Sequence, residues 1–268
     1  MSDEPTAAPR PIVALMQPSF LPWVGYFALM DSVDEFILLD DFQFVRQSFQ
    51  QRNRLFQPGE ARVDWVTVPV VHPGSEARQR LVDVQLADFP RFRKRFSTTL
   101  QQSYARCAGA KRGLQVVEAA LATPPKHLAE LNGMLIKAVA SALGITTPIR
   151  LSSELPSEGR RSERVASLLR NAGARSYYAA RGAAAYMRED GVFPLADIAT
   201  YFQHYVPQPY PQRHVTTFTP YLSALDVLMQ TGEPSEALAF IRAGALPFDP
   251  FSRVAATVEQ AAEEPTES

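Results

Sequence analysis

Cysteine is nearly absent from this sequence. Cys107 is the only one, so an internal disulfide is impossible and a cysteine-rich zinc site is excluded. Long hydrophobic runs are also missing, since no apolar stretch approaches the roughly 18 residues that span a bilayer. The N-terminal segment MSDEPTAAPRP is acidic, proline-rich and without an apolar core, which is unlike a secretory signal. These absences predict a cytoplasmic protein that does not bind a membrane.

Charge of one sign is not in excess. The 27 basic and 28 acidic residues nearly cancel, giving a formal net charge of -1, so no global field would draw the chain to DNA or to an anionic membrane. Any anion site must therefore be local. The densest basic run is RFRKR at 91–95, which we interpret as the solvated face of a helix, because no exposed aromatic residue interleaves with it.

Several familiar catalytic motifs are missing too. The chain has no G-x-S-x-G, no Walker loop and no G-x-G-x-x-G, so serine-hydrolase chemistry, P-loop chemistry and standard dinucleotide binding lose support. Histidines are few and lack metal-ligand spacing: His72, His127, His204 and His214. The sequence predicts no structural zinc, and no cofactor is evident from it.

Strand-like and helix-like segments alternate along the chain. The apolar runs at 12–16 and 35–39 flank a helical pattern at 25–33, and strands are expected again at 147–151, 176–180 and 201–206. Continuous apolar strands suggest burial on both faces, as in parallel sheets covered by helices. We therefore predict an α/β fold, a Rossmann-like three-layer arrangement with a mostly parallel sheet.

The sequence predicts a single α/β domain over 11–250. A helical insertion is expected near 89–143, where Phe and Leu recur at spacings of three and four. Residues 1–10 and 251–268 lack the periodicity of packed elements and are predicted to be disordered tails, the second of them acidic.

Polar residues follow the first two predicted strands. Gln17 opens the proline-stiffened loop MQPSFLPWVGYF, Asp40 and Asp41 end the run EFILLDD, and Gln43 comes two residues later. Ligands of open parallel sheets bind beyond the carboxyl ends of the strands, so these groups would share one rim if the two strands are neighbours. Gly25 would allow the close approach of a ligand or of the adjacent strand.

The adjacent carboxylates have several possible uses. Asp40 and Asp41 could hold a divalent metal with waters, could supply a general base, or could simply pair with arginines. Arg52, Asn53 and Arg54 suit a phosphate or carboxylate, or could instead pin the two aspartates. No metal is predicted, and Asp40 and Asp41 are the expected ligands if a divalent ion is used. Among the histidines, His204 in the loop QHYVPQPYPQ is the best candidate for a general acid or base.

Motifs in a fixed order connect the chain to a known family. The run MQPSFLPWVGYFALMDSVDEFILLDDFQF, then QRNR, then DWVTVPV resembles the opening of the WbqC-like protein family. That family shows a QP-aromatic-LPW-x-GYF loop, an LDD-x-QF segment, an NRN segment and a W-x-TVPV strand. LSSEL at 151–155, YPQ at 210–212 and PYLSALDVLMQTG at 220–232 look like later blocks. The resemblance covers roughly residues 12–243.

The resemblance implies a function in bacterial surface chemistry. The family is associated with surface-polysaccharide and O-antigen clusters, and its proposed role is the transfer of an amino acid, glycine in particular, onto the amine of a sugar. Matching by position places these residues in the family's blocks: Gln17, Pro18, Trp23, Gly25, Tyr26, Asp40, Asp41, Gln43, Asn53 and Arg54. One segment departs, because residues 178–185 replace a glycine-rich Y-L-S-G-x-G pattern and introduce Arg181. This change favours an acceptor other than the family's sugar, such as a specialised metabolite.

We hypothesise an N-acyl or aminoacyl transferase. Asp41, ahead of Asp40, or else His204 would take the proton from an acceptor amine as it attacks an activated acyl donor. The donor's anionic part would lie on Arg52, Asn53 and Arg54, and Gln17 would orient the acceptor. Further substrate-binding residues are predicted at Trp23, Tyr26, Gln43, Arg181, Tyr210 and Gln212.

The partners are expected to be a small-molecule substrate and an activated acyl donor. Aminoacyl-tRNA, a carrier protein and CoA are not distinguished as the donor. One alternative is a metal-dependent nucleotide or sugar-nucleotide transferase that uses the same crevice. Another is a non-catalytic binding subunit of a biosynthetic complex, with the aromatic loop as its partner surface.

Overall fold

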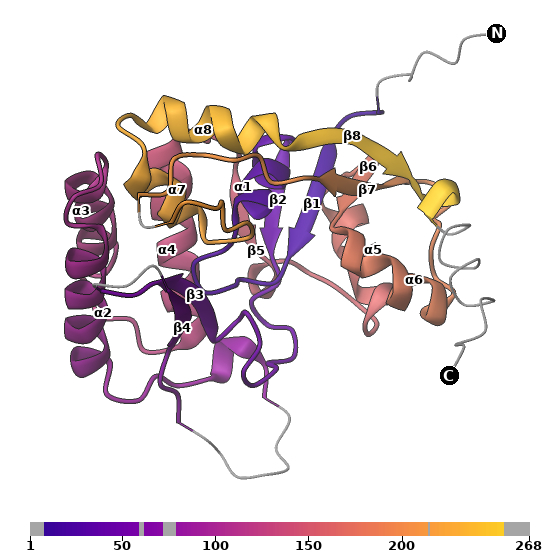
Figure 1. Cartoon of the computed structure of the whole chain (residues 1–268). Helices are drawn as coiled ribbons and strands as arrows, with labels where there is room; N and C mark the ends of the chain where they lie inside the picture. The colour runs from indigo at the N-terminus through magenta and orange to yellow at the C-terminus, as the bar shows by residue number, and fades with distance from the viewer. Residues whose placement is uncertain (1–7, 59–61, 72–78, 214, 255–268) are drawn as a thin grey trace, which may run out of the picture.

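A six-stranded sheet lies at the centre of the computed structural model, which describes residues 8–58, 62–71, 79–213 and 215–254 (Figure 1). The strand order is β5-β2-β1-β6-β7-β8, with every neighbouring pair parallel except β7 and β8. The strands are β1 (Ile12–Met16), β2 (Glu35–Leu38), β5 (Ile149–Leu151), β6 (Ser176–Ala179), β7 (Ala199–Tyr205) and β8 (Ala245–Pro250). The predicted mostly parallel sheet is confirmed.

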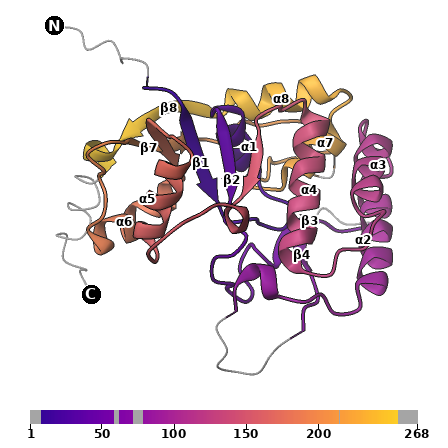
Figure 2. The same ribbon diagram turned by 180° about the vertical axis from the view of Figure 1, so that it is seen from behind.

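Helices cover both faces of this sheet (Figures 1 and 2). Successive side chains of β1 point to opposite faces, so Ile12 and Ala14 join one hydrophobic cluster while Val13 and Leu15 join the other. The first cluster packs under α1 (Val24–Asp31), α4 (Leu128–Leu143), α7 (Ala224–Gln230) and α8 (Pro234–Ala243), the second under α5 (Ser162–Asn171) and α6 (Ala184–Asp190). The Rossmann-like three-layer arrangement follows from this burial on both faces.

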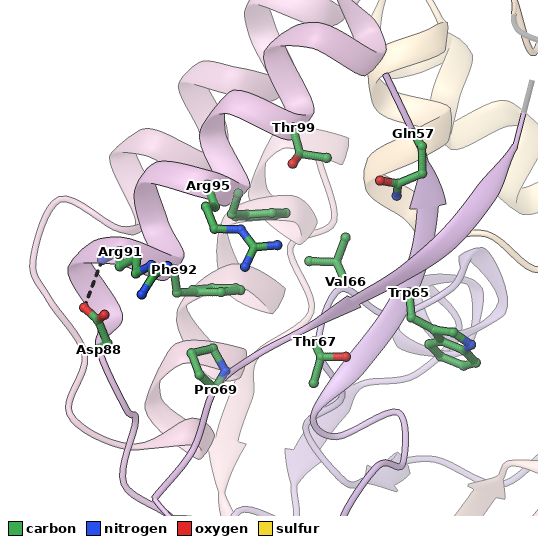
Figure 3. Close-up of a pocket in the computed structure, with 11 residues that line it drawn as sticks. Gln57, Trp65, Val66, Thr67, Pro69, Asp88, Arg91, Phe92, Arg95 and Thr99 are labelled. Atoms are coloured by element: carbon green, nitrogen blue, oxygen red, sulfur yellow. Dashed lines mark hydrogen bonds between the residues drawn. The ribbon is translucent and has the colours of Figure 1, made fainter. Parts of the chain in front are cut away.

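The helical insertion lies beside a small antiparallel hairpin. It comprises α2 (Phe89–Tyr104), α3 (Ala110–Ala120) and α4. The hairpin pairs β3 (Arg52–Phe56) with β4 (Val63–Thr67) outside the main sheet, and α2 runs alongside β4 (Figure 3). β4 ends at Thr67, two residues before Pro69, whose nitrogen has no hydrogen to donate to a neighbouring strand.

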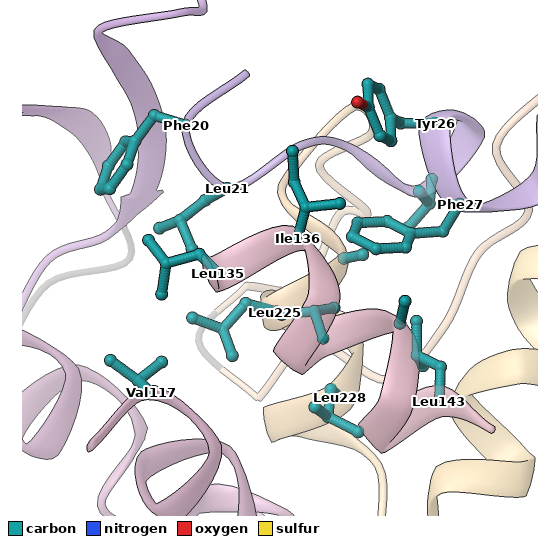
Figure 4. Close-up of a cluster of buried hydrophobic side chains, with 14 of the residues drawn as sticks. Phe20, Leu21, Tyr26, Phe27, Val117, Leu135, Ile136, Leu143, Leu225 and Leu228 are labelled. Carbon is teal, nitrogen blue, oxygen red and sulfur yellow. The ribbon is translucent and has the colours of Figure 1, made fainter. Parts of the chain in front are cut away.

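The larger hydrophobic cluster joins the insertion to the sheet. Figure 4 shows Phe20 and Leu21 of the proline loop close to Leu135 and Ile136 of α4, with Leu225 of α7 below them. All five side chains are buried. The loop after β1 therefore packs into the core instead of lying on the surface.

The predicted tails are only partly described. Residues 1–7 and 255–268 lie outside the described residues, while 251–254, assigned to the C-terminal tail in the prediction, form a helical turn in which Val254 is buried. Within the described part of the chain, no helix is both long and apolar enough to cross a membrane.

Candidate functional site

A cavity of about 500 Å³ opens at the carboxyl ends of β1, β2 and β6. From β1 the chain proceeds to β2 and β5 on one side, and only later to β6 and β7 on the other, so the strand order reverses between β1 and β6. Ligands of open α/β sheets bind at such a reversal. We call it the sheet-end cavity, and it is lined by Leu15, Met16, Gln17, Ser19, Leu39, Phe42, Arg161, Val165, Tyr177, Ala180, Gly182, Ala183 and Tyr186.

Gln17 is the predicted site residue that lines this cavity, and a hydrogen bond from Gln50 fixes its side chain. Gln50 donates a hydrogen bond from Nε2 to Gln17 Oε1 at 2.6 Å, which leaves the Gln17 amide nitrogen as the group able to donate to a ligand. Asn132 of α4 donates from Nδ2 to the carbonyls of Pro18 and Gln50 at 2.9 and 2.8 Å. The prolines and these bonds fix the Gln17 backbone before any ligand arrives.

Asp40 and Asp41 are both buried, and the 3-10 turn that follows β5, Ser152–Glu154, supplies partners for both. Asp40 accepts hydrogen bonds from the Ser152 hydroxyl, the Ser153 N–H and the Ser153 hydroxyl at 3.1, 3.0 and 2.6 Å. Asp41 accepts one from Ser152 at 2.5 Å and forms an ion pair with Arg164 of α5. Neither carboxylate lines the sheet-end cavity. Of the uses left open by the sequence, pairing with an arginine is the one observed, and the arginine is Arg164 in place of Arg52 or Arg54.

The Asp41 ion pair is nevertheless adjacent to the cavity. Phe42, the next residue, lines it, and the Arg164 guanidinium lies 4.9 Å from the centre of the Phe42 ring. Arg164 also donates to the Ser157 hydroxyl at 3.1 Å. The carboxylate, the guanidinium and the lining ring therefore form one connected unit.

Two tyrosines of the cavity were not anticipated from the sequence. Burial raises the pKa of Tyr177 well above its ordinary value, and Tyr186 adds to this shift through its charge and a hydrogen bond. Burial likewise raises the pKa of Tyr186. Both phenols are therefore protonated at neutral pH and can donate hydrogen bonds. Tyr177 lies in a segment that the sequence predicts as a strand, but strand prediction alone does not say which face points to a cavity.

Trp23 and Tyr26 pack into the protein and do not line the cavity. The Trp23 ring contacts the rings of Tyr205 and Tyr221 at centroid distances of 5.2 and 5.5 Å. A Cβ atom built on Gly25 would lie 2.3 Å from Trp23 Cη2, so the close approach expected at Gly25 is made by an indole. Tyr26 is buried, 2% exposed, and packs on Phe27 and Phe36.

His204 and Arg181 meet at a third residue that sequence reasoning missed. Arg181 forms an ion pair with Asp249 of β8 at 3.3 Å, and His204 Nδ1 lies 3.9 Å from the same carboxylate. Arg181 adjoins the cavity-lining Ala180 and Gly182, whereas His204 is not among the lining residues. The signal for Asp249 is weak, because it is an isolated acid in the segment LPFDP.

Two further predicted residues, Asn53 and Tyr210, are buried and make hydrogen bonds inside the protein. Buried Asn53 donates from Nδ2 to the carbonyls of Phe20 and Leu21, the latter at 2.5 Å and at a residue with φ of 47°, so it stabilises the strained loop after β1. Tyr210 donates to buried Asp226 at 2.6 Å.

The other four predicted residues also lie outside the sheet-end cavity. Gln43 is exposed, and its carbonyl accepts a bond from Gln50. Gln212 exchanges hydrogen bonds with the backbone of Thr219. Arg52 and Arg54 lie on the β3–β4 hairpin beside Trp65, away from the residues that line the sheet-end cavity.

No group of three or more His, Cys, Asp or Glu side chains within the described ranges is arranged to hold a metal ion. The oxygens of Asp40 and Asp41 are already engaged by Ser152, Ser153 and Arg164. A divalent ion on these carboxylates would have to displace a cation that is built into the fold.

Comparison with known proteins places the chain in a family. The model of the WbqC-like protein family matches residues 17–237, from the first cavity residue of the proline loop to α8. This chain belongs to the WbqC-like protein family. A relative in Mycobacterium tuberculosis (strain ATCC 25618 / H37Rv), the uncharacterized protein Rv1507c, is 31% identical over 231 residues, which is 86% of this chain and 97% of that protein. No solved structure matches the chain. The WbqC-like match includes every lining residue of the sheet-end cavity except Leu15 and Met16.

Proposed function

We propose that this WbqC-like protein transfers an acyl or aminoacyl group, of the glycine type, from an activated donor to the amine of an amino sugar or a related small acceptor in bacterial polysaccharide or specialised-metabolite biosynthesis. The acceptor binds in the sheet-end cavity. The observation that carries the proposal is the position of Gln17, from the opening motif of the family, at the strand-order reversal where such folds bind ligands.

The lining of the cavity suits a hydroxylated acceptor. Gln17, Ser19 and the phenols of Tyr177 and Tyr186 offer hydrogen-bonding groups, while Leu15, Leu39 and Phe42 are among the residues that supply an apolar wall. Such a mixture of an apolar surface with a few placed polar groups is typical of small-molecule sites. The acceptor would hydrogen-bond through its hydroxyl groups and present its amine to the donor.

The reaction forms a nitrogen–carbon bond and breaks the bond between the acyl carbon and its leaving oxygen or sulfur, and the proton taken from the amine passes to that leaving atom. A protonated phenol can donate to the carbonyl oxygen as negative charge develops there, which is a role open to Tyr186. Asp41 stays our candidate for the general base, because it adjoins cavity-lining Phe42, and this role requires its carboxylate to exchange Arg164 for the amine.

The test supplies acyl-CoA, aminoacyl-tRNA and acyl carrier protein donors together with amino-sugar acceptors, and searches for the amide product by mass spectrometry. We expect product with wild type, a loss of at least tenfold in kcat/KM for Gln17→Ala, and a larger loss in kcat for Asp41→Asn, since general-base help is worth roughly 10²–10⁴ in rate. Arg170→Gln is the control, because Arg170 pairs with Asp197 at the surface. Absence of amide product with every donor would overturn the proposal, and an unchanged kcat for Asp41→Asn would remove Asp41 from the mechanism.

A further inference from the structure

A second cavity, of about 490 Å³, lies between β4 and α2 and shares no lining residue with the sheet-end cavity. Figure 3 shows Arg95 reaching from α2 into the space beside Val66, with Phe92 forming part of its wall. We call it the β4–α2 groove. Its volume is within the roughly 300–1,000 Å³ usual for small-molecule sites.

The groove carries positive charge that the fold does not neutralise. The α2 sequence FPRFRKRFSTTLQQSY contains basic residues and no acid, and both Arg91 and Arg95 line the groove. Neither forms an ion pair with any described residue. The acid that lines the groove is Asp88, which accepts a hydrogen bond from the Arg91 backbone N–H at 3.3 Å, as a helix cap does. Since the chain as a whole has a formal net charge of -1, this concentration of cations is local.

An exposed tryptophan lies at the edge of the same groove. Trp65 lines it and is 40% exposed, and the Arg52 guanidinium lies 4.2 Å from the centre of its ring. Arg54 follows at 6.0 Å, and Phe49, 55% exposed, has its ring centre 5.8 Å from that of Trp65. Nε of Arg52 is buried and has no hydrogen-bond partner. No exposed aromatic residue interleaves with the basic run 91–95 in the sequence, but in the fold the hairpin brings Trp65 to the same groove.

The open edge of β4 is not suited to a peptide strand. Val68 N–H donates to Gln51 and Gln57 N–H donates to Arg62, so by alternation the backbone groups of Trp65 point away from β3. Asp64 Oδ1 already accepts the outward Trp65 N–H at 2.7 Å. An added strand would have to displace this carboxylate, and its own acidic side chains would be repelled by it. Side-chain recognition of a ligand is therefore favoured over strand addition.

We propose that the β4–α2 groove binds the phosphate-bearing nucleotide part of the activated donor, an assignment that rests on the acyl transfer proposed above. Guanidiniums bind phosphate oxygens in bidentate geometry, and a base stacks on an aromatic ring without regard to sequence. Arg91 and Arg95 hold the phosphates, and Trp65 stacks on the base. Two donors share this chemistry, coenzyme A and the 3′ end of an aminoacylated RNA.

The test measures binding by isothermal titration calorimetry with coenzyme A and with a short single-stranded RNA, neither of which carries an acyl group. We expect saturable binding of at least one probe, and affinity that falls as salt rises. The double variant Arg91→Gln, Arg95→Gln weakens binding by at least about tenfold, since a hydrogen bond to a charged group contributes that much. Trp65→Leu weakens it by about tenfold through lost stacking.

Matched controls lie on the same helix. Arg93 and Lys94 line a different hollow with Phe89 and Pro90, so Arg93→Gln and Lys94→Gln leave the affinity unchanged. Binding of coenzyme A alone assigns the donor to CoA, and binding of RNA alone assigns it to an aminoacylated RNA. Absence of binding by both probes, or binding that the double variant leaves unchanged, overturns the proposal. Capture of an acyl carrier protein that depends on Arg91 and Arg95, with neither probe bound, also overturns it.

The outcome is separate from that of the transfer assay, because neither probe is turned over. Binding without amide formation leaves the groove assigned and the proposed reaction refuted. Amide formation from a donor that lacks a nucleotide, with no binding of either probe, supports the reaction and refutes the groove. Where both succeed, the double variant raises KM for the donor and leaves KM for the acceptor unchanged.

Discussion

The sheet-end cavity and the β4–α2 groove differ in how their charges are paired. Around the sheet-end cavity, Asp41 is held by Arg164, and Arg161 lies 3.3 Å from Asp190. In the β4–α2 groove, Arg91 and Arg95 line the wall with no ion-pair partner within the described ranges. In the first region the ion pairs join the segment after β2 to α5 and α5 to α6, whereas in the second region the guanidiniums are left to solvent.

This difference shows that a charged residue in a family motif can serve either the fold or the binding of a ligand. A carboxylate that is buried and paired contributes to the geometry of a site even where it never touches a ligand. An exposed arginine without an acid partner contributes little to stability and is available to an anion. The comparison therefore predicts opposite responses to substitution in the two regions.

The largest effect is expected at the paired carboxylate. Asp41→Ala removes a buried acceptor and leaves Arg164, whose side chain is 23% exposed, without its partner. Breaking a buried ion pair in this way costs about 3–5 kcal/mol, so urea unfolding should show a loss in that range. Asp41→Asn keeps an acceptor for Ser152 and should lose less. A loss below about 1 kcal/mol for Asp41→Ala would mean that solvent screens the Asp41–Arg164 ion pair as it does an ion pair on the surface. The two regions would then not differ in how much their charges contribute to stability.

A smaller loss is expected at the start of α1, where the loop that leads from the sheet-end cavity ends. Gly25→Ala places a methyl group 2.3 Å from Trp23 Cη2, so the indole must move away from Tyr205 and Tyr221. Overpacking of this kind costs about 1–3 kcal/mol, measurable by thermal or urea unfolding. A variant of unchanged stability would show that Trp23 is free to move and that the loop is not fixed in advance.

Gly182→Ala is the comparison for that variant. A Cβ atom at Gly182 meets nothing within 4 Å, so the unfolding free energy should stay within about ±0.5 kcal/mol. Because Gly182 lines the sheet-end cavity, the added methyl group should instead raise KM for the acceptor in the transfer assay. A large loss of stability with an unchanged KM would mean that the segment around Gly182 stabilises the fold and does not contact the acceptor.

The sequence predicts most of the architecture of this fold. Continuous apolar strands such as 12–16 can be buried only under helices on both faces, and the stripe of Phe92 and Phe96 defines one face of α2. These patterns depend only on residues that are close in the sequence, so the strands and helices that they predict are found in the structure. The adjacency of Gln17 to the carboxyl end of β2 also follows, because strands joined by a single helix tend to be neighbours.

The partners of individual side chains could not be predicted in the same way. Asp40 and Asp41 meet Ser152 and Ser153 because β5 pairs with β2, and that pairing joins residues more than a hundred positions apart. Trp65 and Arg95 line the same groove because α2 runs alongside β4. Periodicity gives the buried face of an element, but not the element that it faces.

The smallest effect on stability is expected in the groove. Arg95→Gln removes a cation that has no acid partner among the described residues and whose side chain reaches into open space (Figure 3). Its unfolding free energy should therefore remain within about ±0.5 kcal/mol of wild type, as should that of Arg93→Gln on the same helix. If Arg95→Gln alone costs more than about 1 kcal/mol, the guanidinium is stabilising α2 against β4, and its charge is not free for a ligand. If Arg95→Gln weakens nucleotide binding and leaves the stability unchanged, Arg95 serves to bind the ligand. Arg164, by contrast, stabilises the fold through its ion pair with Asp41.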